Sequence, residues 1–149
     1  MSSNQHKYQV DLQWNEGRIG TLRSPALDDE IEVATPPDFD GGVEGFWSPE
    51  HLFLSSVSSC FMTTFTAIAE YSKLAFEDLQ VKAIAKLGKV DGKFAVTEIT
   101  LQPELLIEDE KYADKARRIM EKAEEACLIT RSIKTDIIFD PTVNIGALK

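Results

Sequence analysis

The chain has 149 residues, enough for a substantial hydrophobic core, and we expect a single domain over residues 1–149. Its 43% hydrophobic and 28% charged residues are typical of a globular protein and exclude a disordered or fibrous one. The formal net charge of −9 at pH 7 argues against a nucleic-acid partner, because proteins bind phosphates through Lys and Arg.

The N-terminal residues 7–15 alternate apolar and polar side chains, a pattern that predicts a half-buried strand. Its apolar face comprises Tyr8, Val10, Leu12 and Trp14. Nothing before this strand has the apolar core of a signal peptide, so we expect a cytoplasmic protein. In the cytoplasm a pair of cysteines is more often catalytic, redox-active or metal-binding than a structural disulfide.

Two further strands are predicted before the first helix. Residues 15–18 form a turn, residues 19–24 return as a strand, and residues 30–34 form a third short strand. The following loop, residues 35–47, contains two prolines and three glycines, and irregular loops of this kind often line functional sites.

A long helix is predicted from residue 48 to about residue 73. Ser48 is a suitable N-cap, Pro49 fits the first helical position, and Glu50 lies where the helix dipole favours a negative charge. The helix is apolar on nearly every side, and Cys60, one of the two cysteines of the chain, lies in its middle.

This helix contains an uncharged run, residues 52–69, that is long enough to raise the question of a membrane span. Seven of its 18 residues are Ser or Thr, acidic residues flank it at Glu50 and Glu70, and no cluster of Lys or Arg lies close by. We therefore predict a buried core helix and no membrane partner.

The length of the helix also bears on the oligomeric state. A helix of roughly 24 residues is about 36 Å long, close to the diameter of about 40 Å expected for a compact monomer of this size. One small sheet and one further helix do not readily cover such an apolar helix on all sides. We therefore expect a homodimer in which two of these helices pack together.

The C-terminal half is predicted to begin with a hairpin. A strand at residues 79–88 is followed by an Asp-Gly turn within residues 90–93 and by a returning strand, residues 94–107. Pro103 implies that the returning strand lies at a sheet edge or is kinked, because proline has no backbone N–H to donate.

An amphipathic helix at residues 109–126 and a last strand at residues 134–140, ended by Pro141, follow the hairpin. The apolar stripe of the helix comprises Tyr112, Ala116, Ile119, Met120 and Ala123. Cys127 continues this stripe, so its side chain is also expected to point inward. The order of three strands, a helix, two strands, a helix and a strand predicts an α+β fold.

The two cysteines have a plain structural explanation, because free cysteine often packs in cores as a small hydrophobic side chain. A zinc site is not expected, since Cys60, Cys127, His6 and His51 lack the close spacing of zinc ligands. The sequence also lacks the GxSxG motif of a serine hydrolase.

Three motifs around the cysteines resemble those of the OsmC/Ohr family, the osmotically inducible and organic hydroperoxide resistance proteins. The family pattern has N-P-E-x-L at the start of the central helix, A/S-C-F near its middle, and C-P-[VYI]-S before the final strand. The corresponding segments are SPEHL at residues 48–52, SCF at residues 59–61 and CLIT at residues 127–130. The predicted order of elements agrees, so the resemblance covers essentially the whole chain.

The resemblance implies an intertwined homodimer and a thiol-dependent peroxidase. Cys60 would reduce an organic or lipid hydroperoxide, or hydrogen peroxide, and Cys127 would resolve the sulfenic acid as an intramolecular disulfide. An N-terminal arginine and Glu50 would complete the site. A dithiol, including lipoyl groups on proteins, would serve as the reductant, with no cofactor and no metal.

A buried thiol needs a compensating group for this chemistry, because only the thiolate attacks a peroxide and burial raises the pKa of a thiol. One cation about 4 Å away contributes at most roughly 4 kcal/mol at an effective dielectric of 20, or about three pKa units. One arginine is therefore enough. The resemblance assigns this role to Arg18, which follows the predicted turn as the Ohr-type arginine does, and Arg23 is the alternative.

The remaining candidates each have two interpretations. Glu50 lies about 15 Å along the helix from Cys60, so it would pair with the arginine or act from the partner chain; otherwise it is a carboxylate favoured by the helix dipole. Aromatic side chains of the loop and helix would line an apolar substrate pocket or simply cover the helix ends; these are Phe39, Phe46, Trp47 and Phe61.

Two departures from the family pattern concern the second cysteine. Leu128 replaces the proline that usually follows it, and Arg131 stands where small or polar residues are common, which bears on the orientation of Cys127. The alternative to an enzyme is a non-enzymatic protein of this fold that binds an apolar ligand or senses redox state through its disulfide. In a further alternative, both cysteines stay reduced in the core.

Overall fold

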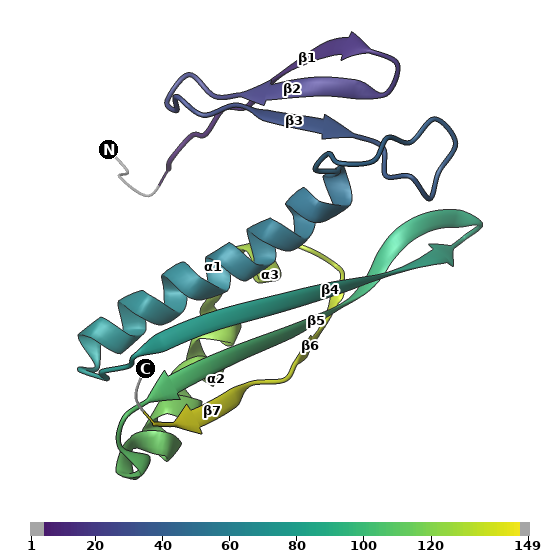
Figure 1. Cartoon of the computed structure of the whole chain (residues 1–149). Helices are drawn as coiled ribbons and strands as arrows, with labels where there is room; N and C mark the ends of the chain where they lie inside the picture. The colour runs from purple at the N-terminus through teal and green to yellow at the C-terminus, as the bar shows by residue number, and fades with distance from the viewer. Residues whose placement is uncertain (1–4, 147–149) are drawn as a thin grey trace. The chain divides into compact units, whose positions relative to one another are not determined.

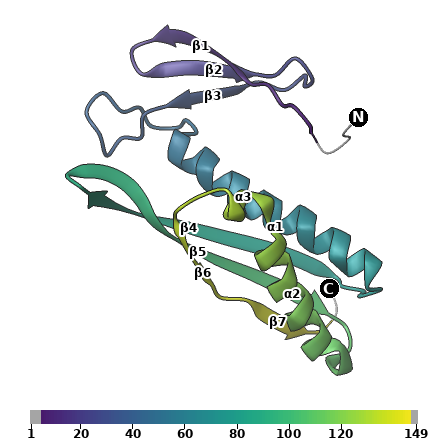
Figure 2. The same cartoon turned by 180° about the vertical axis from the view of Figure 1, so that it is seen from behind.

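The structure, a computed structural model, describes residues 5–146 (Figures 1 and 2). It divides into two compact units, Met1–Leu52 and Phe53–Lys149. Each unit has its own β-sheet, and the predicted α+β class is confirmed.

The first unit contains a three-stranded antiparallel sheet in the order β1-β2-β3. The strands are β1 (Asp11–Glu16), β2 (Ile19–Arg23) and β3 (Ile31–Ala34), close to the predicted ranges. The alternating side chains of the predicted first strand, however, are not half-buried. Leu12 and Trp14 are each 65% exposed, so the predicted burial is wrong for the chain by itself. Alternating apolar and polar side chains show that one face of a strand can be buried, but they do not show what buries it.

The loop between β3 and the first helix folds back on itself. Val43 N donates to Thr35 O over 2.9 Å, and Ala34 N donates to Trp47 O over 2.8 Å. Only glycine fits at position 42, because a Cβ there would lie 2.0 Å from the carbonyl oxygen of Pro36. The loop is therefore a compact structure, and its end returns alongside β3 through an isolated bridge between Val33 and Trp47.

Helix α1 (Pro49–Tyr71) begins where Ser48 and Pro49 predicted. Val57, Phe61, Phe65 and Ala69 are buried, and their spacing of four residues places them on one face of the helix. By length and composition α1 could also cross a membrane, although core helices of soluble proteins pass the same test. The prediction of burial on nearly every side is wrong for the single chain, since one face is buried and the others are partly open.

The second unit is built on a long hairpin of β4 (Asp78–Val90) and β5 (Lys93–Ile107). Two short strands, β6 (Asp136–Phe139) and β7 (Thr142–Ile145), both pair with β5 in parallel. The sequence predicts β6 but not β7, because Pro141 predicts the end of the last strand.

Pro103 lies in the central strand β5, so of the two predicted alternatives, a sheet edge or a kink, the sheet edge is wrong. The carbonyls of Leu101 and Ile107 accept bonds from Asp140 N and Gly146 N, on the side of β6 and β7. Residues two apart along a strand direct their backbone groups to the same side, so residue 103 also faces the side of β6 and β7. It lies opposite the gap between these two strands, where the missing N–H of proline costs no ladder hydrogen bond.

The last helices are the 3₁₀ turn η1 (Glu110–Tyr112), α2 (Ala113–Ala126) and the short α3 (Leu128–Arg131). Four of the five residues predicted for the stripe of α2 are buried, namely Ala116, Ile119, Met120 and Ala123. Tyr112 is 45% exposed because it precedes α2. The inward orientation of Cys127 is confirmed, and α3 was not predicted.

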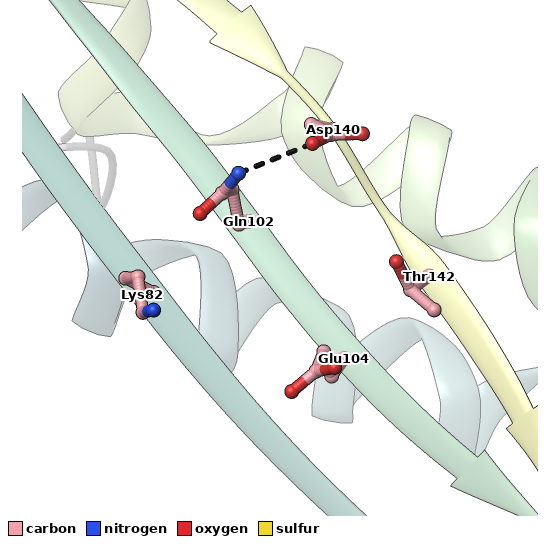
Figure 3. Close-up of a pocket in the computed structure, with 5 residues that line it drawn as sticks. All are labelled: Lys82, Gln102, Glu104, Asp140 and Thr142. Carbon is pink, nitrogen blue, oxygen red and sulfur yellow. Dashed lines mark hydrogen bonds between the residues drawn. The ribbon is translucent and has the colours of Figure 1, made fainter.

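The core of the second unit lies between its sheet and its helices. Apolar residues of α1, α2 and alternate positions of β5, including Ile99, Leu101 and Leu105, form one buried cluster. The opposite face of the sheet carries both polar side chains and exposed apolar ones, Ile84 and Ile138. Figure 3 shows five of its polar side chains in front of the strands, with the helices behind them. There the Gln102 Nε2 donates to Asp140 Oδ2 over 3.2 Å, beside Lys82, Glu104 and Thr142.

Candidate functional site

The second unit brings Cys60 and Cys127 together, although 67 residues separate them in sequence. Cys60 lies in the middle of α1, and Cys127 lies at the junction of α2 and α3. Both are free thiols, and each affects the pKa of the other, so the two side chains are neighbours. Cys127 is 1% exposed, whereas Cys60 is only partly buried, so the predicted burial of Cys60 is wrong for the single chain.

A break between two helices positions Cys127. It ends α2 and precedes α3 with an extended backbone (φ −62°, ψ 114°), so the chain changes direction at this residue. The first turn of α3 then folds back toward the thiol, because Thr130 Oγ1 donates to Cys127 Sγ over 3.3 Å. The same turn is closed by a bond from Arg131 N to Cys127 O of 3.1 Å.

Hydrogen bonds to the Cys60 sulfur affect the pKa of this thiol. Partial burial by itself would raise its pKa, but donors outweigh this effect and hold the pKa below the ordinary value. In order of effect they are the peptide N–H of Ile129, the Cys127 thiol, the Thr64 hydroxyl and the peptide N–H of Leu128. Thr64 Oγ1 lies 4.0 Å from the sulfur.

The thiol of Cys127 shows the opposite behaviour. Burial raises its pKa, and although hydrogen bonds from Thr130 lower it, the neighbouring Cys60 raises it further. A thiolate at Cys60 is therefore favoured beside a protonated thiol at Cys127. Such a pair combines a nucleophile with a second thiol placed to attack what the nucleophile forms.

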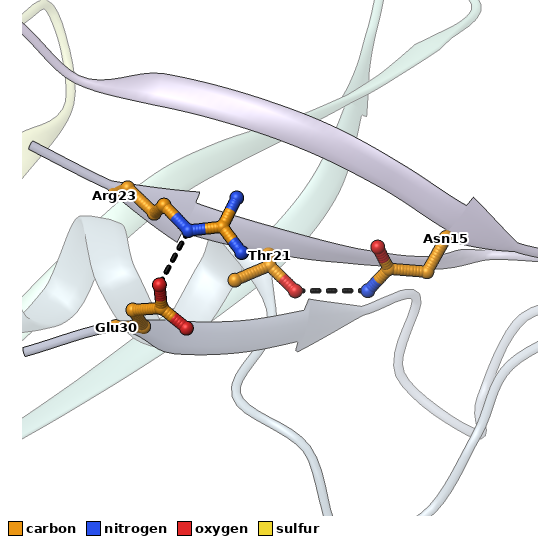
Figure 4. A network of polar contacts seen from close by, with 4 residues as sticks. All are labelled: Asn15, Thr21, Arg23 and Glu30. Atoms are coloured by element: carbon orange, nitrogen blue, oxygen red, sulfur yellow. Dashed lines mark hydrogen bonds and ion pairs between the residues drawn. The ribbon is translucent and has the colours of Figure 1, made fainter.

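The two candidate arginines, both in the first unit, have different surroundings. Arg23 forms an ion pair with Glu30, beside a bond of 2.8 Å from Asn15 Nδ2 to Thr21 Oγ1 (Figure 4). Arg18 lies along the loop, where a Cβ on Gly41 would be 3.2 Å from both its Cγ and its Nε. Within residues 5–146 Arg18 forms no ion pair.

The start of α1 holds the third candidate, Glu50. Its Oε1 is buried and has no hydrogen-bond partner among the described residues. Glu50 and Arg18 form no ion pair with each other in the described chain. A buried carboxylate oxygen without a donor is costly, so this atom is suited to accept a bond from a cation.

Ser48 and His51 form a reciprocal cap at the same helix start. His51 N donates to Ser48 Oγ over 3.2 Å, and Ser48 N donates to His51 Nδ1, also over 3.2 Å. The Ser48 hydroxyl lies 2.7 Å from the same ring nitrogen. The cap at Ser48 was predicted, but the part of His51 was missed; its signal was the spacing of three residues typical of a capping box.

The aromatic candidates divide between two places. Phe46 and Trp47, with Gly45 and His51, line a pocket of about 250 Å³, and Trp47 meets the His51 ring edge-on at 5.9 Å. Phe39 is not among the residues that line this pocket. Phe61 is fully buried in the core, with ring centroids 6.0 Å from Phe65 and 5.6 Å from Phe139, so it packs the core of the second unit instead of lining this pocket.

No group of three or more His, Cys, Asp or Glu residues able to hold a metal ion occurs within residues 5–146. The groups that lower the pKa of Cys60 include Cys127, which the motifs identified, and Thr64 and two peptide groups of α3, which the sequence analysis did not name. Thr64 carries a weak signal in sequence, because it follows Cys60 by one helical turn. The peptide groups of Leu128 and Ile129 carry none.

Comparison with known proteins agrees with this arrangement. The model of the family described as OsmC-like protein matches residues 41–142, which include both cysteines and Glu50. The chain belongs to the OsmC-like family. The family expected from the SPEHL, SCF and CLIT motifs is thereby confirmed.

Relatives of this OsmC-like chain match it over nearly its whole length. An uncharacterized protein of Bacillus subtilis, YmaD, is 28% identical, over 95% of this chain and 97% of that protein. An OsmC-like protein of unknown function from Vibrio cholerae has a TM-score of 0.83 at 22% identity, covering 92% of this chain and 99% of the other. An organic hydroperoxide resistance protein from Elizabethkingia anophelis has a TM-score of 0.75 at 22% identity, covering 97% and 99%. At these identities the solved structures establish the fold.

Proposed function

We propose that this OsmC-like protein is a thiol-dependent peroxidase that reduces organic hydroperoxides, lipid hydroperoxides included, or hydrogen peroxide. The observation that carries the proposal is the pairing of Cys60 and Cys127, whose pKa values shift in opposite directions. A lone core cysteine needs neither a second thiol nor donors aimed at its sulfur. The organic hydroperoxide resistance protein from Elizabethkingia anophelis, which shares the fold, gives further support by its name.

The proposed reaction has three balanced steps. The Cys60 thiolate attacks one peroxide oxygen, the O–O bond breaks, and the alkoxide leaves and takes a proton as the alcohol, which leaves a sulfenic acid on Cys60. The Cys127 thiol then attacks that sulfur, and the hydroxyl group leaves as water while the disulfide forms. A dithiol reductant, such as a lipoyl group on a protein, reduces the disulfide and is itself oxidised to a disulfide.

Arg18 and Glu50 are proposed to complete the site. Arg23 is engaged by Glu30, whereas Arg18 forms no ion pair among the described residues, which favours Arg18 as the cation. The buried Oε1 of Glu50 lacks a donor and is suited to a bidentate pair with a guanidinium group, from its own chain or a partner. A cation at the site would stabilise the charge that develops on the leaving oxygen.

A homodimer is proposed as the working form of the protein. Helix α1 buries one face in its own chain, and apolar side chains of β1 such as Leu12 and Trp14 are exposed. Exposed apolar patches often mark protein interfaces. The pocket beside Phe46 and Trp47 is proposed to hold the apolar part of the substrate, and the protein is proposed to act in the cytoplasm.

The test is catalytic turnover. Purified protein is mixed with cumene hydroperoxide and dihydrolipoamide, and consumption of the peroxide is followed over many equivalents. We expect many turnovers with the native protein and none with Cys60→Ser. A Cys60→Ser variant that consumes peroxide at the native rate would refute the proposal and leave ligand binding or redox sensing by the same fold.

A further inference from the structure

The side chain of Arg18 lies against the backbone of the loop that joins β3 to α1. A Cβ on Gly41 would be 3.2 Å from both the Cγ and the Nε of Arg18 and 3.5 Å from its Cζ. At 3.2 Å an ordinary van der Waals contact is not possible, so the arginine would have to move by a few tenths of an ångström. The stem and the guanidinium group of Arg18 therefore occupy space that is open only because residue 41 has no side chain.

Backbone hydrogen bonds place both sides of this contact. Arg18 comes directly before β2, and the pairing of Ile19 with Ala34 puts the start of β2 beside the end of β3, where the loop begins. Within the loop, Gly42 N donates to Phe39 O over 2.9 Å and so fixes the backbone between them. All of these residues belong to the first unit, so the contact is independent of the second unit.

No carboxylate holds Arg18 in this position. The loop carries three acidic residues on either side of Gly41, namely Asp38, Asp40 and Glu44. Arg18 forms no ion pair with them or with any other of residues 5–146. An exposed ion pair would in any case fix the arginine weakly, because such pairs contribute little free energy. Arg18 is therefore placed by its packing on the backbone at Gly41 and not by an opposite charge.

We propose that Gly41 is a positioning residue, whose bare backbone sets where the guanidinium group of Arg18 lies. The catalytic meaning of this inference rests on the proposed function, in which Arg18 stabilises charge on the leaving oxygen. Such a group acts only if it is in place before the reaction, and a displacement of about 1 Å costs about a hundredfold in rate. A displacement of a few tenths of an ångström therefore predicts a loss of about three- to tenfold.

The chain offers a matched pair of glycines for the test. The backbone angle φ is +79° at Gly41 and +78° at Gly92, so alanine is strained to a similar extent at both positions. A Cβ on Gly92 meets no heavy atom within 4 Å, whereas a Cβ on Gly41 meets Arg18. Gly92 lies in the turn between β4 and β5, outside the candidate site. Gly41→Ala and Gly92→Ala therefore separate the contact with Arg18 from backbone strain.

The first measurement is kcat/KM for cumene hydroperoxide with dihydrolipoamide as the reductant. We expect Gly41→Ala to lower kcat/KM about three- to tenfold and Gly92→Ala to leave it within about twofold of the native value. In an Arg18→Ala background Gly41→Ala should cause no further loss, because residues that act through one another are not additive. Equal values for Gly41→Ala and Gly92→Ala, or a loss at Gly41 that persists without Arg18, would overturn the inference.

A second measurement uses NMR spectra of the native protein and no peroxide, so it serves even if Gly41→Ala does not fold. The Hε proton of Arg18, assigned by its loss in Arg18→Lys, should show a nuclear Overhauser effect to an α proton of Gly41. Gly41→Ala should also shift the Nε–Hε signal of Arg18, and Gly92→Ala should not. A native spectrum without this effect would contradict the inference. A native protein without turnover would instead contradict the proposed function, and the contact at Gly41 would still be decided by the NMR spectra.

Discussion

The two units differ in whether their candidate site residues find partners within the described chain. In the second unit the chain supplies a buried core, both thiols and the donors around the Cys60 sulfur. In the first unit a strand exposes Leu12 and Trp14, and the carboxylate of Glu50 has a buried oxygen without a partner in the described chain. The second unit thus brings both thiols together, whereas Arg18 and Glu50 form no ion pair within residues 5–146.

Removing the proposed nucleophile, Cys60, is expected to have the largest effect on activity. Cys60→Ser should lower the rate of peroxide consumption by more than about a thousandfold, because a serine hydroxyl at neutral pH does not reach the anionic form that attacks the O–O bond. Cys127→Ser is the matched control: it should react once and accumulate a sulfenic acid at Cys60. Labelling with dimedone and mass spectrometry distinguish the two variants, and a sulfenic acid formed elsewhere would contradict the assignment.

Stability measurements sharpen the contrast between the cores of the two units. Phe65→Ala should lower the free energy of unfolding by about 3–5 kcal/mol, because its ring is fully buried against Phe61 and Phe76. Leu12→Ala should change the free energy of unfolding little at protein concentrations where the chain is monomeric. In a dimer that covers β1, Leu12→Ala should instead shift the monomer–dimer equilibrium in analytical ultracentrifugation. A dimer unaffected by that change would exclude β1 from its interface.

The arginines of the first unit provide a second matched pair. Arg18→Ala should reduce kcat/KM for cumene hydroperoxide by about a hundred- to a thousandfold, the range for losing one donor that stabilises a transition state. Arg23→Ala should leave kcat/KM within about twofold, because exposed ion pairs such as Arg23–Glu30 contribute little. Reversed effects would move the catalytic cation to Arg23.

The pH dependence of thiol reactivity tests the second unit alone. The pKa of Cys60 is lowered, so its alkylation rate should rise with pH and level off below the ordinary thiol value of 9.0. The pKa of Cys127 is raised, so its alkylation should remain slow until above that value. At pH 7.5 Cys60 should therefore react several-fold faster than Cys127. The opposite order, read by mass spectrometry, would exchange the roles of the two cysteines.

Local patterns predicted the elements whose boundaries depend on neighbouring residues. Ser48 and Pro49 fixed the start of α1, and the stripe through Ala123 correctly turned Cys127 inward. Strand β7 was missed because a proline ends one strand without preventing another after it. The predicted burial of β1 and α1 is too high for the single chain. Sequence periodicity shows which faces of an element are apolar, but it does not show which of them are buried within one chain.

In the candidate site, the sequence likewise predicted which residues take part but not which of their atoms meet. The motifs identified Cys60 and Cys127, which the fold brings together. The peptide groups of α3 that help to lower the pKa of Cys60 were not predicted, because a sequence does not show where a peptide N–H points.

The most direct test of the paired thiols is a count of free thiols in the native protein, before and after one equivalent of cumene hydroperoxide. We predict that two thiols disappear together within seconds and that an intramolecular disulfide between Cys60 and Cys127 forms. If both thiols persist for hours, the two cysteines are core residues and the protein has the fold without the chemistry.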